Sequence, residues 1–186
     1  MAFAAEPPRT GSLIHAMRVF GFAGWSGSGK TSLIEALIPT LTADGLRVSL
    51  VKHAHHTFDV DQPGKDSYRH REAGCTEVLV SSAARWALMH ELRGERELAL
   101  REAIDRLSPC DLILVEGYKR AAIPKLEIWR PSVGKPLLHP GDPDILAIAT
   151  DAPADVGAGI RVFALNEVGA IATFVRERAA AWPLAD

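Results

Sequence analysis

Gly24-Trp25-Ser26-Gly27-Ser28-Gly29-Lys30-Thr31 is the stretch of sequence that decides the fold. It fits the pattern G-x-x-x-x-G-K-[ST], which is typical of a phosphate-binding loop. Glycines let successive backbone N–H groups turn inward on a phosphate. Lys30 places a positive charge on the β- and γ-phosphates, and the Thr31 hydroxyl is a ligand for Mg²⁺. The pattern predicts that the protein binds a nucleoside polyphosphate.

The flanking sequence provides the setting that such a loop requires. Residues 17–23 are mostly apolar and predict a short strand, and residues 32–41 predict a helix that ends by Gly45. A strand, a glycine-rich loop and a helix in this order are the context of a P-loop. The dinucleotide pattern G-x-G-x-x-G does not fit, because it requires glycine where Ser32 stands.

The composition is that of a globular protein. The chain has 186 residues, 47% of them hydrophobic and 24% charged. This length suits one domain, predicted over 17–186, after a loose N-terminal tail at 1–16. A net charge of −2 gives no electrostatic argument for nucleic acid or an anionic membrane as partner. With no transmembrane stretch, no signal-peptide pattern and no C-x-x-C motif, we expect a cytoplasmic protein with free thiols.

Predicted strands and helices alternate along the chain, which indicates an α/β fold with a mainly parallel sheet and helices on both faces. Two neighbouring strands at 76–81 and 85–90 predict an antiparallel hairpin within this plan. The other predicted strands are 46–51, 112–115, 125–129, 145–149 and 161–165, and the other predicted helices are 67–73, 95–107 and 167–180, the last capped by Asn166. The sequence therefore predicts a three-layer P-loop NTPase fold.

Glu116 directly follows the apolar strand 112–115. A P-loop protein needs an acidic side chain at the end of a neighbouring strand to hold the Mg²⁺ ion or its water shell. The alternative is an exposed glutamate at a strand end. Given the P-loop, we favour the metal-binding role for Glu116, together with Thr31.

The polar stretch 52–66 is too rich in ionisable groups for an ordinary connection. Three interpretations are open: a transition-metal site, a solvated loop, or a switch loop that senses phosphate or contacts a partner. The metal interpretation would use three histidines, but no cysteine accompanies them and nothing nearby completes a zinc set: His53, His55 and His56. In the switch loop, Asp59 and Asp61 are candidates for orienting the attacking water or for binding magnesium.

Asp151 ends a late predicted strand. Its carboxylate is suited to accept hydrogen bonds from the N1–H and N2–H₂ groups of guanine, which would select GTP over ATP. A plain turn aspartate before Pro153 is the alternative.

With these residues in view, the chain resembles the molybdopterin-guanine dinucleotide biosynthesis protein B (MobB) family. The resemblance covers about residues 18–174. It rests on four motifs: GWSGSGKT (24–31), LVKHAHHTFDVDQPGKDSYRHREAG (50–74), SSAARWALM (81–89) and DLILVEGYK (111–119). Very many NTPases share the P-loop, whereas the second motif is far more particular.

The resemblance implies a GTP-binding protein with weak GTPase activity that uses Mg²⁺ and is usually a homodimer. Such proteins assist the guanylyltransferase that attaches GMP to molybdopterin. The resemblance assigns the phosphate cradle to Gly27, Ser28, Gly29, Lys30, Thr31 and Ser32, and the acidic strand end to Glu116. Relatives often carry a second lysine early in the P-loop, where this chain has Trp25, so a lysine that reaches across a dimer is not supported.

Two other functions use the same loop. A small-molecule kinase would need an arginine-bearing lid, for which Arg69 and Arg71 are the candidates. A non-catalytic adapter would use GTP only to order residues 53–66 for a partner.

Overall fold

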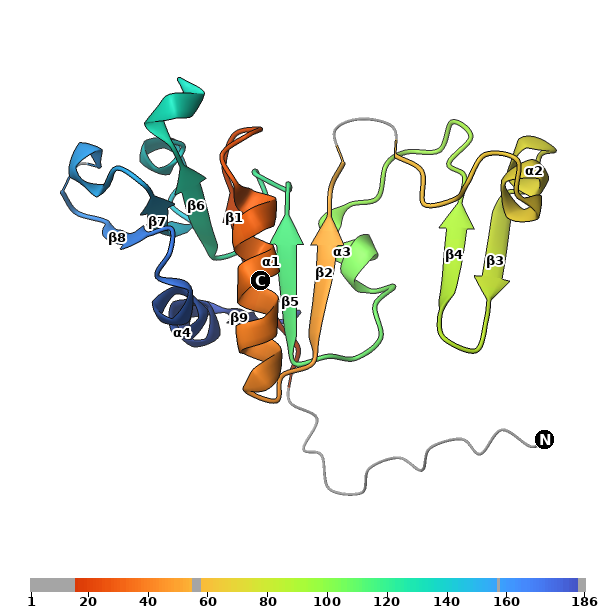
Figure 1. The fold of residues 1–186 in the computed structure, drawn as a ribbon, viewed down its shortest axis with the longest axis horizontal. Coiled ribbons are helices and arrows are strands. Elements are labelled where there is room, and N and C mark those ends of the chain that lie inside the picture. Colours follow the sequence, from red (N-terminus) through yellow and green to blue (C-terminus); the bar gives the residue numbers. More distant parts are fainter. Residues whose placement is uncertain (1–15, 55–57, 157, 184–186) are drawn as a thin grey trace. The chain divides into compact units, whose positions relative to one another are not determined.

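The computed structural model describes residues 16–54, 58–156 and 158–183. The chain divides into two compact units (Figure 1): the first comprises Met1–His53 with Ile104–Asp186, and the second is Ala54–Ala103. Residues 1–15 of the predicted tail lie outside the described part of the chain, and the single domain over 17–186 stays a prediction. None of the described helices is long and apolar enough to cross a membrane.

The first unit contains a seven-stranded sheet in the order β2-β5-β1-β6-β7-β8, with β9 paired to β1. Its strands are β1 (Arg18–Ala23), β2 (Val48–Lys52), β5 (Leu112–Glu116), β6 (Lys125–Trp129), β7 (Ile145–Thr150), β8 (Arg161–Ala164) and β9 (Ala180–Ala181). All neighbours run parallel except β9, which is antiparallel to β1. The prediction of a mainly parallel sheet is confirmed, and the carboxyl ends of its parallel strands share one edge.

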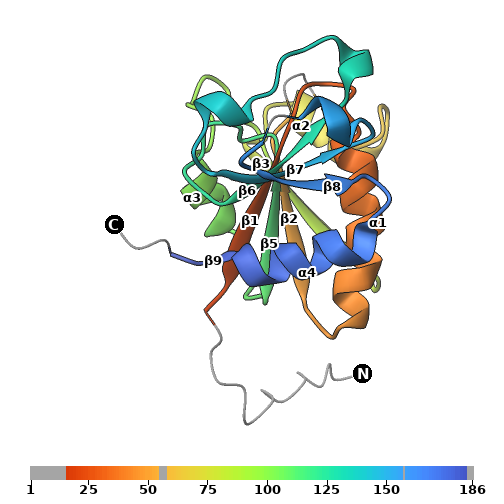
Figure 2. The same ribbon diagram turned by 90° about the vertical axis from the view of Figure 1, so that its left-hand side faces the viewer.

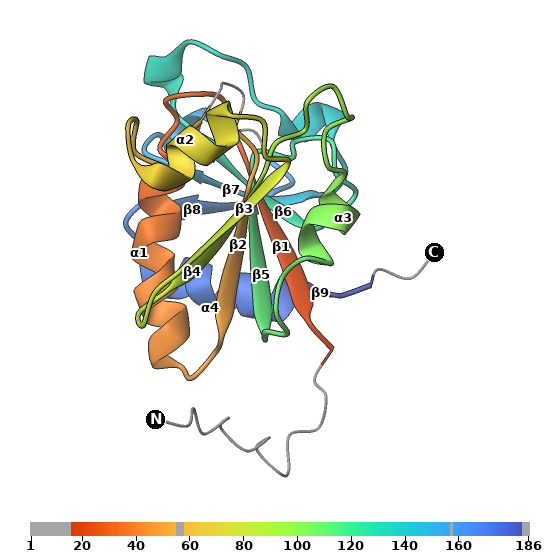
Figure 3. The same ribbon diagram turned by 90° about the vertical axis from the view of Figure 1, so that its right-hand side faces the viewer.

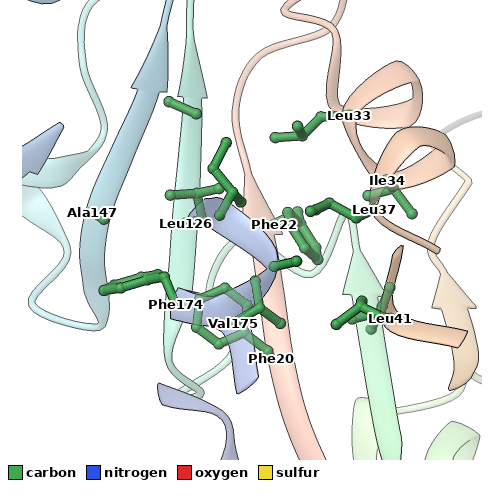
Figure 4. Packing of buried hydrophobic residues seen from close by; sticks show 14 of the residues in the cluster. Phe20, Phe22, Leu33, Ile34, Leu37, Leu41, Leu126, Ala147, Phe174 and Val175 are labelled. Carbon is green, nitrogen blue, oxygen red and sulfur yellow. The ribbon is translucent and has the colours of Figure 1, made fainter. Parts of the chain in front are cut away.

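Burial of apolar side chains explains why these strands form the centre of the first unit. Every residue of β5 is buried, as expected for a parallel strand covered on both faces. Helices α1 (Lys30–Ala43) and α4 (Val168–Arg178) cover the same face of the sheet (Figure 2). Figure 4 shows four residues of α1 facing phenylalanines of β1 and α4: Leu33, Ile34, Leu37 and Leu41. Because Leu37 and Leu41 are fully buried, their packing holds α1 together past Pro39, which lies inside the helix.

On the opposite face of β6, two buried charged side chains replace apolar ones. Lys125 Nζ lies 2.8 Å from Asp142 Oδ2, and Glu127 accepts the backbone N–H groups of Leu138 and His139 at 2.7 and 2.8 Å. Burial raises the pKa of Glu127, and the two N–H donors oppose this shift. These contacts fasten residues 138–142, which belong to the stretch 131–143 predicted only as a linker, to β6.

Two predicted helices differ from the structure at their ends. The helix expected over 95–107 forms only as α3 (Leu100–Ile104), because the Glu102 carboxylate accepts the Ala99 N–H and caps the helix at that point. The helix expected to reach residue 180 ends at Arg178, since Ala180 and Ala181 instead pair with the start of β1. The N-cap of α4 is Glu167, not Asn166.

The second unit contains α2 (Asp66–Glu72), β3 (Glu77–Ser81) and β4 (Trp86–His90). The two strands form a separate antiparallel pair in which Glu77 opposes His90 and Ser81 opposes Trp86 (Figure 3). The predicted hairpin is confirmed. Three short 3₁₀ turns complete the elements of the described chain: η1 (Pro131–Val133), η2 (His139–Gly141) and η3 (Pro153–Asp155).

Candidate phosphate-binding site

The predicted phosphate loop connects the carboxyl end of β1 to the start of α1. Gly24, Gly27 and Gly29 have φ angles of 146°, 80° and 95°, values that side chains other than glycine rarely adopt. A Cβ on Gly24 would also lie 2.4 Å from the Ile128 carbonyl oxygen, so β6 excludes any side chain there. Gly29 is the N-cap of α1 and its carbonyl accepts the Leu33 N–H at 3.0 Å. The helix therefore opens directly on the loop with its free N–H groups at the site.

The loop lies at the switch point of the sheet. Strand β1 is flanked by β5 on one side and β6 on the other, so connections leave the sheet in both directions around the loop. Ligands of open α/β sheets bind at such a point, outside the carboxyl ends of the strands. The strand ends nearest the loop are those of β5, β6 and β2, and these supply the remaining side chains of the site.

Lys30 and Ser28 are two polar side chains of the loop that lie partly or fully buried. The Lys30 ammonium donates hydrogen bonds to the carbonyls of Gly24 (3.0 Å) and Trp25 (2.9 Å), which folds it back over the loop. Burial lowers the pKa of Lys30, and Glu116 opposes that shift. Ser28 is buried, and its Oγ has no hydrogen-bond partner among the residues that the structure describes. A buried unpaired hydroxyl is costly, so this atom is suited to receive a ligand.

Thr31 and Glu116, the predicted magnesium ligands, are brought together. The Thr31 hydroxyl donates to Glu116 Oε1 at 2.9 Å, and the Glu116 side chain is only 7% exposed. The Thr31 hydroxyl and the Glu116 carboxylate are hard oxygen ligands, which suit Mg²⁺. Phosphate oxygens usually complete the coordination of this ion in P-loop sites. Among the described residues no group of three or more His, Cys, Asp or Glu side chains could hold a metal alone. The donor set therefore fits a magnesium ion carried by a nucleotide.

Lys52, which sequence reasoning did not single out, lies beside this pair. It ends β2, next to β5, and its Nζ is 3.1 Å from Glu116 Oε2 and 3.4 Å from Thr31 Oγ1. The signal in the sequence was its position immediately after an apolar strand, the same argument that identified Glu116.

Arg130 was missed in the same way, at the end of β6. A Cβ built on Gly29 would lie 3.4 Å from its Nη2 atom, so the guanidinium lies against the phosphate loop. Its Nε is 3.6 Å from Asp151 Oδ2. Asp151 thus lies at the same edge as the loop, paired to an arginine that touches the loop, and its reading of guanine stays a prediction.

Trp25, in the first half of the phosphate loop, has two lysine ammonium groups beside its ring. The Nζ atoms of Lys119 and Lys135 lie 4.7 and 5.9 Å from its ring centroid, within the range of cation–π attraction. Its indole N–H donates to the Pro136 carbonyl at 2.8 Å. Two positive charges besides Lys30 are therefore held beside the loop by tertiary contacts.

The predicted switch residues Asp59 and Asp61 belong to the second unit, where both contact Arg71. Arg71 Nη2 lies 2.8 and 3.0 Å from the two Asp59 oxygens, its Nε is 3.4 Å from Asp61 Oδ2, and its Nη1 is 2.7 Å from Glu91 Oε1. The Asp61 N–H, followed by Arg71, lowers the pKa of Asp59. These contacts make the carboxylates part of an ion-pair network, and their role toward water or metal stays a prediction.

Of the three histidines, only His53 lies in the described part of the chain; the predictions for His55 and His56 fall outside it. The His53 N–H donates to the Glu116 carbonyl at 2.8 Å, and its ring centroid is 5.1 Å from that of Tyr118. A Cβ on Gly117 would lie 2.8 Å from the His53 carbonyl oxygen. His53 thus extends the pairing of β2 with β5 past Glu116.

A family model and two relatives that resemble this chain all belong to molybdopterin-guanine dinucleotide biosynthesis. The model of the family described as molybdopterin guanine dinucleotide synthesis protein B (MobB) matches residues 19–151. Over 162 residues, 86% of this chain and 91% of the relative, the chain is 44% identical to the molybdopterin-guanine dinucleotide biosynthesis adapter protein of Escherichia coli (strain K12). Over 158 residues, 84% of this chain and 86% of the relative, it is 42% identical to the protein of the same name from Haemophilus influenzae.

Solved structures agree with this match. A crystal structure of molybdopterin-guanine biosynthesis protein B superposes with a TM-score of 0.62 at 27% identity, covering 86% of this chain and 97% of the other. The Bacillus subtilis MobB structure has a TM-score of 0.67 at 22% identity, covering 88% and 98%, and supports the fold alone.

Proposed function

The chain belongs to the MobB family and has an accessory role in molybdenum cofactor biosynthesis, and from this premise we propose that it is a GTP-binding adapter. In this proposal it binds GTP with Mg²⁺, hydrolyses it slowly, and acts in the cytoplasm as a homodimer. Its partner is the guanylyltransferase that attaches GMP to molybdopterin. GTP binding is the step from which the rest follows.

The observation that carries this proposal is the junction of the phosphate loop with the strand end of β5. Thr31 Oγ1 and Glu116 Oε1 are 2.9 Å apart, and the Lys30 ammonium lies across the loop that precedes them. A glycine-rich loop at a helix N-terminus, a lysine and two hard oxygen ligands are the features required to bind a nucleoside triphosphate with its metal.

In the proposed complex, the amides of Gly27 to Lys30 hold the phosphate chain and Lys30 exchanges its loop carbonyls for the β- and γ-phosphates. Thr31 and Glu116 hold Mg²⁺, which neutralises charge on the phosphate oxygens. Arg130, against Gly29, adds a second positive charge near the loop. Because Asp59 and Asp61 are engaged by Arg71, we expect poor orientation of the attacking water and slow turnover. Slow turnover suits a protein whose nucleotide state gates partner binding.

The test is a calorimetric titration of the purified protein with GTP, ATP, GDP and ADP, each with and without Mg²⁺. We expect GTP to bind more tightly than ATP, and Mg²⁺ to strengthen triphosphate binding. Asp151→Asn should reduce the preference for GTP over ATP if this side chain reads guanine. Failure of all four nucleotides to bind would overturn the proposal.

The partner is tested with purified guanylyltransferase immobilised on a sensor surface. We expect binding of this protein to change at least severalfold between its GTP-loaded and GDP-loaded forms. Equal binding in both forms, with nucleotide affinity intact, would remove the gating part of the proposal.

Exposed apolar side chains of the hairpin support the proposed homodimer. Leu79, Trp86 and Leu88 are 61%, 67% and 50% exposed on β3 and β4. A two-stranded hairpin alone is marginally stable, so a second copy that covered these side chains would stabilise it. Light scattering should give twice the chain mass, and Trp86→Glu should shift the protein toward monomer. A wild-type monomer at micromolar concentration would contradict the dimer.

A further inference from the structure

Lys52 is held against the magnesium ligands by backbone pairing. It is the register partner of Glu116 in the parallel pair β2–β5, and the next residue donates its N–H to the Glu116 carbonyl at 2.8 Å. The two main chains are therefore fixed relative to each other. Only the four-carbon side chain of Lys52, which is 50% exposed, is free to move.

The Lys52 ammonium contacts the same two side chains that are suited to a metal ion. It lies 3.1 Å from Glu116 Oε2 and donates to Thr31 Oγ1 at 3.4 Å, while Thr31 and Glu116 are joined at 2.9 Å. A divalent cation bonded to this hydroxyl and carboxylate would face the ammonium at short range. The positive charges of the cation and the ammonium would repel each other, and the repulsion is strong beside a largely buried carboxylate, where water screens charges poorly.

We propose that Lys52 competes with the divalent metal ion for Glu116 and Thr31, so that its ammonium acts as an exchangeable internal cation of the nucleotide site. This inference rests on the proposed nucleotide function. When Mg²⁺ enters with the nucleotide, Lys52 gives up Glu116 and turns its ammonium outward or toward the phosphates. Without the metal, Lys52 neutralises Glu116 and supports phosphate binding.

The place of Lys52 in the chain makes this competition relevant to an adapter. The second unit begins at Ala54, two residues after Lys52. The metal ion and the lysine therefore exchange at the point where the chain leaves the nucleotide site for the other unit.

Metal affinity of the GDP-loaded protein tests the inference directly, with Mn²⁺ as the probe and electron paramagnetic resonance as the readout. Lys52→Met removes the competing charge and should tighten Mn²⁺ binding about three- to fivefold, near the upper end of the range expected for a half-exposed ion pair. GDP affinity in EDTA should fall in the same variant, so that the ratio of affinities with and without metal rises.

Lys119→Met is the matched control. Lys119 also acts on Lys30 electrostatically, but its ammonium lies over the Trp25 ring. Its loss should weaken GDP binding similarly with and without metal and leave Mn²⁺ affinity within twofold of wild type. Lys52→Arg keeps the charge and should bind Mn²⁺ no more tightly than wild type. This variant tests the inference if Lys52→Met does not fold.

An unchanged or weaker Mn²⁺ affinity in Lys52→Met, or a tighter one in Lys52→Arg, would overturn the inference while leaving nucleotide binding in place. Failure of the wild-type protein to bind GDP at all would instead overturn the proposed function from which the inference starts.

Discussion

The two compact units of this chain are stabilised by different forces. In the first, apolar side chains from α1, α4 and the sheet are buried together, and β5 is buried at every position. In the second, α2 has no buried residue, while Arg71, with a side chain only 12% exposed, joins three carboxylates. A large apolar core fixes backbone positions closely, as a phosphate loop requires, whereas ion pairs in a small unit hold it more weakly. The difference places the phosphate loop in the unit with the large apolar core, whereas the second unit is held mainly by ion pairs.

The largest expected effect is a loss of stability in the first unit, at Gly24. Gly24→Ala combines a φ of 146° with a Cβ only 2.4 Å from a backbone oxygen of β6, so we expect it to lower the free energy of unfolding by about 3 kcal/mol. Gly27→Ala is the control, because a Cβ there meets nothing within 4 Å and only its φ of 80° opposes it; a loss of about 1 kcal/mol is expected. Urea unfolding measures both, and equal losses would mean that the contact with β6 is unimportant.

The next effect concerns ligand affinity without a change of stability. Lys30→Ala removes the ammonium assigned to the β- and γ-phosphates, so GTP affinity should fall about 100-fold, as expected for loss of charge-assisted hydrogen bonds. The melting temperature should change little, since this ammonium contacts only loop carbonyls. Arg47→Ala, which lies before the amino end of β2 with a side chain 67% exposed, is the control that keeps GTP affinity. Intact GTP binding and hydrolysis in Lys30→Ala would contradict the P-loop assignment.

A smaller, local effect is expected in the second unit. Arg71→Met leaves Asp61, which is only 8% exposed, without its cationic partner, so amides around residues 59–61 and 91 should exchange hydrogen faster. Arg69→Met, on the same helix but 73% exposed, should change exchange little. Protection in the first unit should be unaffected in both variants.

Asp59→Ala and Asp61→Ala decide between the catalytic and the structural role of these carboxylates. The switch-loop hypothesis predicts slower GTP hydrolysis with nearly unchanged GDP affinity. Equal loss of hydrolysis and GDP affinity, together with faster hydrogen exchange in the second unit, would mean that the network around Arg71 is structural.

The smallest effect depends on pH and is confined to the hairpin. Glu77, at 2.8 Å, and Glu95, at 3.5 Å, raise the pKa of His90 above its ordinary value near 6.5. The stabilisation is therefore fully present below about pH 6.5 and is lost as the pH rises through the higher pKa of the folded state. Hydrogen exchange of β3 and β4 amides should be slower at pH 6 than at pH 8.5 after correction for intrinsic rates, and His90→Gln should remove this difference. A pH dependence that persists in His90→Gln would show that another group is responsible.

Local pattern was sufficient to predict the parallel strands of the first unit, since runs such as 112–115 are apolar without interruption, but it did not predict β9. It was also sufficient for the hairpin. It was insufficient at element ends. A local cap from Glu102 to the Ala99 N–H starts α3 late, and a tertiary contact pairs Ala180 and Ala181 with β1 instead of leaving them in α4. Sequence also indicated Thr31 and Glu116 but not Lys52 or Arg130. Their position directly after a strand was the available signal, and it does not by itself distinguish a lysine or arginine of the site from a solvated one.

The sequence by itself determined that this chain carries a P-loop on a mainly parallel α/β sheet and that it resembles the MobB family, because both depend on residue types at fixed local spacings. Only the tertiary structure decided which charges surround the loop. Lys52, Lys119 and Arg130 come from strand ends and loops far apart in the chain, and Trp25 and Glu116 hold two of them in place. The order of strands in the sheet sets those distances, and that order is a property of the folded core rather than of any one segment.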